Sequence, residues 1–97
     1  MHVPSHPDAD IELEEAVLFY EKRSEGLGEN LLEDFERTIE RIVSNPCRYR
    51  RIKGNIHQLG LQRFPFNIVY EIHKNDIYIL AVAHVRRRPF YWSQRHS

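Results

Sequence analysis

The apolar positions in the first half of the chain recur every three or four residues. One stripe consists of Ala9, Leu13, Ala16, Val17 and Tyr20. A second stripe consists of Leu31, Leu32, Phe35, Ile39, Ile42 and Val43. This spacing is typical of amphipathic helices. Gly26 and Gly28 lie between the stripes and allow the chain to reverse, so the pattern predicts an antiparallel helical hairpin that ends at Asn45-Pro46.

The second half changes to a period of two. Apolar and other residues alternate from Phe66 to His73, and Lys74-Asn75-Asp76 is suited to a hairpin turn. The next segment, Ile77 to Val85, is apolar at nearly every position, which predicts a central strand that is covered on both faces. An earlier extended segment runs from Ile56 to Arg63, before a bend at Pro65. We interpret residues 48–55 as a polar, cationic connection.

These elements predict an α+β fold. We expect the helical hairpin to pack on a twisted antiparallel sheet of three to four strands, with a short C-terminal helix or turn after Pro89. A chain of 97 residues can close one hydrophobic core, so residues 1–97 are expected to form a single domain. The hairpin covers one face of the sheet, and little chain remains for the other. The uncovered face would favour a bound partner or a dimer.

Composition excludes several classes of protein. No stretch approaches 18 apolar residues, which argues against a membrane span, and Met1–Ser5 lacks the apolar region of a secretory signal. The lone Cys47 cannot form an internal disulfide, which fits a reducing compartment. We therefore expect a cytoplasmic protein that does not contact membranes.

The net charge of zero conceals a strong asymmetry. Residues 1–46 hold twelve acidic and four basic residues, whereas residues 47–97 hold two acidic and ten basic ones. The two halves therefore carry formal charges of −8 and +8. Such a separation favours a surface for an anionic partner, either nucleic acid or an acidic peptide.

Most familiar catalytic motifs are absent. The chain has no phosphate-binding glycine loop and no serine in a nucleophile-elbow context. The acidic residues Glu33, Asp34, Glu36 and Glu40 have no histidine or cysteine at ligand spacing. We interpret them as a solvated helix face, and we expect neither a metal nor a cofactor.

One constellation could carry chemistry. It consists of Arg63, His84, Arg86, Arg87 and Tyr91, with His57 and Lys53 as outer members. Arginines bind phosphate groups and histidine exchanges protons near neutral pH, so these residues could support RNA cleavage by an attacking 2′-hydroxyl. The alternative is a basic surface that contacts an acidic partner, and the residue pattern alone favours this alternative.

Several strings together resemble the ParE branch of the RelE/ParE toxins. They are Leu13-Glu14-Glu15-Ala16, Gly26-Leu27-Gly28, Asn45-Pro46, Arg63-Phe64-Pro65-Phe66, Val69-Tyr70 and the ending from His84 to Trp92 with Arg95. The resemblance implies a toxin of a bacterial type II toxin–antitoxin system, often associated with plasmid stabilisation. Such a toxin is held inactive by a co-expressed antitoxin, and the expected assembly is a homodimer or a toxin–antitoxin hetero-oligomer.

The resemblance implies two kinds of target. A ParE-like toxin poisons a protein, DNA gyrase, without being an enzyme, and the partner-binding residues would be Arg63, Phe64, Phe66, Arg86, Arg87, Arg88, Tyr91 and Trp92. A RelE-like toxin is a ribosome-dependent messenger RNA endoribonuclease, and the catalytic candidates would be His84, Arg86 and Tyr91. A degenerate, non-toxic relative is a third alternative.

Two features depart from the resembled pattern. Asn67 follows Phe66 where the ribonucleases tend to carry arginine, which favours the non-enzymatic alternative. Only about five residues precede the first helix, so the N-terminal edge strand of the family would be short or absent.

Overall fold

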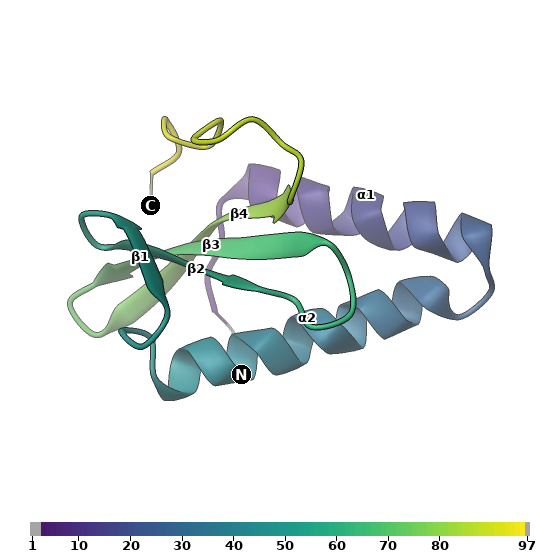
Figure 1. The fold of residues 1–97 in the computed structure, drawn as a ribbon, viewed down its shortest axis with the longest axis horizontal. Helices are drawn as coiled ribbons and strands as arrows, with labels where there is room; N and C mark the ends of the chain where they lie inside the picture. The colour runs from purple at the N-terminus through teal and green to yellow at the C-terminus, as the bar shows by residue number, and fades with distance from the viewer. Residues whose placement is uncertain (1–2, 97) are drawn as a thin grey trace.

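Within residues 3–96, two helices and one four-stranded sheet make up the fold. The structure, a computed structural model, describes residues 3–96. The elements in chain order are α1 (Pro7–Arg23), α2 (Leu27–Ser44), β1 (Arg50–Lys53), β2 (Ile56–Gly60), β3 (Phe66–His73) and β4 (Asp76–His84). The strands pair antiparallel in the order β1-β2-β3-β4. Residues of both helices pack against the sheet in one core cluster, and the helices diverge from their connecting turn (Figure 1). The predicted α+β fold is confirmed.

The turn between the helices depends on its two glycines for different reasons. Gly26 adopts a left-handed conformation with φ of 87°, which glycine reaches without steric cost. At Gly28, an added Cβ would lie 2.5 Å from the carbonyl oxygen of Val17, so the helices approach too closely there for any side chain. The Glu21 carboxylate accepts hydrogen bonds from the N–H groups of Gly26 and Gly28 at 2.9 and 3.0 Å. It thereby caps the start of α2.

The segment predicted as a cationic connection is partly a strand, and that prediction was wrong. Residues Arg50–Lys53 form β1, which pairs with β2 through Arg50↔Gln58 and Arg51↔His57. Three of its four residues are exposed, so β1 shows no alternation of apolar and polar residues. Its strand conformation comes from backbone pairing with β2, which sequence periodicity does not report.

β4 lies at the edge of the sheet, which corrects the prediction of a central strand. Beyond it, the N-terminal segment makes one isolated parallel bridge, Ser5↔Ile79. The His6 N–H donates to the Ile79 carbonyl at 2.8 Å, and the Ile79 N–H donates to the Pro4 carbonyl at 3.0 Å. Among the described residues, the expected N-terminal edge strand is reduced to this bridge.

The sheet is nevertheless covered on both faces. On the helix side, the core contains Ala9, Ile39, Ile42, Ile68, Tyr70, Ile79 and Val82. On the other side, Val69, Leu80, Ala81 and Ala83 pack with Trp92 from the C-terminal segment. This segment forms a series of turns across residues 85–94, passing over the face opposite the helices (Figure 1). The expectation of an uncovered apolar face was wrong, because Trp92 is buried on this face and Ile52, Ile56, Tyr78 and Tyr91 pack around the cluster.

No helix within residues 3–96 has both the length and the apolar character needed to cross a membrane.

Candidate functional site

Two loops meet at one end of the sheet and carry most of the predicted site residues. The Val85 N–H, just after β4, donates to the carbonyl of Pro65, in the loop after β2, at 2.9 Å. In the β3–β4 register Phe66 lies opposite His84, and their rings pack edge to face with centroids 5.2 Å apart. The structure therefore brings together the loops that hold Arg63, Phe64, Phe66, His84 and Arg86–Arg88. We call the residues Arg63, Phe64, Phe66, Arg86, Arg87 and Arg88 the cationic end.

A buried carboxylate fixes the loop after β2, which carries Arg63. Asp34 of α2 is only 4% exposed, and its two carboxylate oxygens accept from the N–H groups of Gln62 at 3.1 Å and Arg63 at 2.8 Å. Its interpretation as part of a solvated face was wrong. Because the carboxylate accepts from two partly buried backbone donors, it fixes the backbone that carries Arg63.

Aromatic packing fastens the same loop to α1. The Phe64 ring packs edge-on against Tyr20 with centroids 5.0 Å apart, and the Phe66 ring lies 6.3 Å from Tyr20. Both phenylalanines are half-buried. Their rings therefore pack against α1 and also leave part of their surface exposed at the cationic end.

The arginines of the cationic end are exposed. Among residues 3–96, the ion pairs involve His6, Arg37 and Arg95, and none involves Arg63, Arg86, Arg87 or Arg88. The Arg87 guanidinium lies 3.9 Å from the centroid of the Tyr91 ring, a distance suited to a cation–π interaction. The remaining three guanidinium groups are available to an anionic partner.

Glu12 organises the segment that follows these arginines. Its carboxylate accepts from the Val82 N–H at 3.0 Å, from the Tyr91 hydroxyl at 2.7 Å and from two Arg95 nitrogens at 2.9 and 3.0 Å. Arg95 also donates to the Leu80 carbonyl at 3.0 Å. Glu12 and Arg95 together satisfy backbone groups of β4 and tie the C-terminal segment to α1.

The protonation behaviour of this cluster follows from its contacts. Burial alone would raise the pKa of the Glu12 carboxyl, but the hydrogen bonds from Arg95, Tyr91 and Val82 outweigh burial, so its pKa is lowered. Burial and the hydrogen bond to Glu12 raise the pKa of the Tyr91 hydroxyl. Near neutral pH the cluster therefore holds an ionised Glu12 and a neutral Tyr91.

Two predicted site residues thus contribute to the fold itself. The Tyr91 hydroxyl is bonded to Glu12, and Trp92 is 5% exposed within the second core cluster. They hold the arginine-bearing segment in place. His84 accepts a hydrogen bond at Nδ1 from the Arg86 N–H at 3.1 Å, which fixes the turn after β4.

The outer members of the sequence constellation lie elsewhere. His57 is buried on the helix side, stacked on Tyr70 with centroids 5.7 Å apart, and its Nδ1 lies 2.9 Å from the Tyr49 carbonyl oxygen. Lys53 is exposed on β1, at the opposite edge of the sheet from β4. The structure does not bring either residue to the cationic end.

Phe90 is a residue that the sequence reasoning missed. It is 49% exposed, and its φ of 62° lies in the left-handed region, which is uncommon for bulky side chains. No sequence signal identifies such a conformation, because it results from the turns around it.

Among residues 3–96, no group of three or more His, Cys, Asp and Glu side chains is arranged to hold a metal ion.

Comparison with known protein families matches residues 5–89 to the ParE toxin of type II toxin–antitoxin system, parDE. The matched range contains both helices, all four strands and Arg86–Arg88, and it ends just before Phe90. No curated protein was found to match the chain.

Proposed function

The chain belongs to the ParE toxin family of type II toxin–antitoxin systems, and from this we propose that it arrests growth by binding a protein target, DNA gyrase. In this proposal the toxin does not catalyse a reaction, and the cationic end contacts the target. A cognate antitoxin neutralises the toxin by covering the same arginines.

The state of Tyr91 is the observation that carries the proposal. RNA cleavage needs a proton acceptor and a proton donor placed at the phosphate. The Tyr91 hydroxyl instead donates to Glu12 at 2.7 Å, and its pKa is raised. Of the other catalytic candidates, His84 accepts at Nδ1 from the Arg86 N–H at 3.1 Å, so this nitrogen is engaged with the backbone. This supports a binding surface over a catalytic centre.

The geometry of the cationic end supports recognition of an anionic surface. Asp34 ties the loop that carries Arg63 to α2, and the hydrogen bond from the Val85 N–H to the Pro65 carbonyl ties this loop to the segment after β4. Arg63 and Arg86–Arg88 therefore project from a fixed backbone. Exposed arginines on rigid supports contribute specificity and speed of association, and both effects weaken as salt increases. We expect binding to the antitoxin to be salt-sensitive for the same reason.

A supercoiling assay with purified protein and DNA gyrase tests the proposal. We expect the wild-type chain to inhibit supercoiling and Arg86→Glu/Arg88→Glu to be about tenfold weaker, because like charges then face the target. Arg50→Glu is the matched control, since Arg50 is an exposed arginine on β1 outside the cationic end, and it should inhibit normally. An absence of inhibition at concentrations that arrest cells would falsify the gyrase target.

Primer extension on translated messages separates the alternatives. Cuts within codons that disappear in Arg86→Ala would assign the chain to the ribosome-dependent endoribonucleases. Wild-type expression without any growth defect would instead identify a non-toxic relative that retains antitoxin binding.

A further inference from the structure

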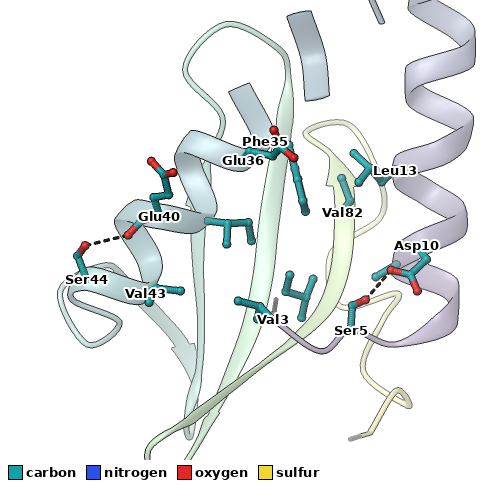
Figure 2. A pocket seen from close by; sticks show the side chains of 13 residues that line it. Val3, Ser5, Asp10, Leu13, Phe35, Glu36, Glu40, Val43, Ser44 and Val82 are labelled. Carbon is teal, nitrogen blue, oxygen red and sulfur yellow. Dashed lines mark hydrogen bonds between the residues drawn. The ribbon is translucent and has the colours of Figure 1, made fainter. Parts of the chain in front are cut away.

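An apolar groove opens between the two helices. The helices touch closely where Gly28 meets Val17 and diverge toward the start of α1 and the end of α2 (Figure 1). The space between them is a groove of about 670 Å³ with β4 as its floor (Figure 2). Its apolar lining includes Leu13, Phe35, Ile39, Val43, Ile79 and Val82.

The rim of this groove is acidic. Asp10 of α1 and Glu36 and Glu40 of α2 line it and are exposed. Among residues 3–96, none of the three forms an ion pair with a basic residue. The hydroxyl of Ser5 donates to Asp10. An apolar groove with a rim of this charge favours an occupant that combines an apolar side chain with flanking cations.

The chain itself displays such an element. The segment Arg86–Phe90, which we call the arginine–aromatic loop, carries three exposed arginines and the half-exposed ring of Phe90. The left-handed conformation of Phe90 costs of the order of 1 to 3 kcal/mol for a non-glycine residue, and such strain is concentrated at functional positions. The Phe90 ring packs against Trp92 with centroids 5.7 Å apart and stays 49% exposed, so the loop offers part of an aromatic ring beside three exposed arginines.

A molecule cannot place this loop in its own groove. The groove is on the helix side of the sheet, whereas the C-terminal segment crosses the opposite face (Figure 1). Trp92 is buried on that face, and Arg95 is bonded to Glu12. Contact between the loop and a groove of this kind therefore requires a second copy of the chain.

We propose that the chain associates head to tail, with Phe90 of one copy seated in the groove between α1 and α2 of the next. Arg86 and Arg88 then face the acidic rim formed by Asp10, Glu36 and Glu40. The formal net charge of zero removes long-range repulsion between copies, and the opposite charges of the two halves favour this orientation. The contact joins two different surfaces, so it produces dimers and then longer assemblies rather than a symmetric pair. This inference does not depend on the identity of the toxin's target.

Sedimentation velocity over a range of protein and salt concentrations tests the proposal. The wild-type chain should associate at low salt and dissociate as salt increases. The groove variant Glu36→Lys/Glu40→Lys and the loop variant Arg88→Glu/Phe90→Ala should each associate at least about tenfold more weakly, a change of roughly 1.4 kcal/mol. All of these side chains are exposed, and circular dichroism verifies that both variants remain folded.

Mixing the two variants provides the decisive measurement. The groove variant retains an intact loop and the loop variant retains an intact groove, so the mixture should form a one-to-one heterodimer that does not grow further. The matched control is Glu14→Lys/Glu15→Lys, which reverses two exposed charges on α1 outside the groove and should associate like the wild type.

Three results would overturn the proposal. They are a wild-type chain that stays monomeric at every concentration, association that both variants retain, and a mixture that forms no heterodimer. If the groove variant loses antitoxin binding while the wild-type chain stays monomeric, the groove belongs to the antitoxin.

Discussion

At the scale of single residues, two buried carboxylates decide the position of the surrounding chain. Glu12 lies between Ala9 and Ala16, and Asp34 lies three residues after Leu31, so helical spacing places both acids on the buried faces of their helices. The sequence contained this signal, although Asp34 was predicted to be solvated. Their partners could not be predicted, because those partners are 28 or more residues away along the chain.

Replacement of Asp34 tests its role in holding the loop of Arg63. Asp34→Ala leaves the N–H groups of Gln62 and Arg63 without an acceptor, and we expect the free energy of unfolding to fall by about 1 to 3 kcal/mol. Urea denaturation measures this loss, and amide hydrogen exchange should accelerate at Gln62 and Arg63. Glu33→Ala is the control, since Glu33 is exposed and pairs with Arg37 on the surface, and it should change stability by less than about 0.5 kcal/mol. Unchanged exchange at Gln62 and Arg63 in Asp34→Ala would contradict this role.

At the scale of elements, the C-terminal segment acts as the second layer over the sheet. It contains no helix or strand among the described residues, yet it contributes Trp92 to the second core cluster and Arg95 to the edge of β4. A turn-rich segment can do this because one large aromatic side chain covers much of the small surface formed by Ala81 and Ala83. The segment therefore belongs to the fold rather than to a mobile tail.

Removal of the Arg95 side chain should release this segment. Arg95→Ala leaves Glu12 partly buried without its cationic partner, and we expect a loss of about 3 kcal/mol in the free energy of unfolding. Trp92 is the one tryptophan in the chain, so a red shift of its emission in the native state would report its exposure to water. Arg88→Ala, an exposed arginine of the same segment, should leave both quantities unchanged. An unchanged emission in Arg95→Ala would show that packing alone holds the segment.

At the scale of the whole molecule, the two charged halves of the sequence become two distinct regions. The acidic half forms both helices, and the basic half forms the sheet and the C-terminal segment. Among residues 3–96, Arg95 joins them through ion pairs with Glu12 at 2.9 Å and Asp8 at 4.0 Å. The opposite regions favour anionic partners at the cationic end and a cationic partner at the groove.

The lowered pKa of Glu12 links folding to pH. A carboxyl whose pKa is lower in the folded protein contributes stability that is fully present above its ordinary value of 4.5 and is lost as pH falls through the folded value. We expect wild type to exceed Glu12→Gln in stability at pH 7, and this difference to shrink below pH 4.5. Urea midpoints between pH 7 and pH 3 measure the difference, with the exposed Glu14→Gln as control. A difference that is independent of pH would show that Glu12 contributes through packing and not through its charge.

The sequence predicted the features that local chemistry controls. Both helices, the glycine turn between them, the strand Phe66–His73 and the turn at Lys74 were predicted correctly, because each depends on residues a few positions apart. The family resemblance predicted the α+β arrangement and the family itself. β1 was missed because an exposed edge strand has no apolar alternation, and β4 was misplaced because a strand at the sheet edge can be buried on both faces by distant segments.

By itself, the sequence determined the helical hairpin, the separation of charge and the arginines that end the sheet, since all of these follow from residue type and spacing. Only the tertiary structure decided which acids are buried, that Trp92 covers the sheet, that Tyr91 is bonded to Glu12, and that the helices diverge into a groove. These properties depend on contacts between residues tens of positions apart, and neither periodicity nor composition contains information about such contacts.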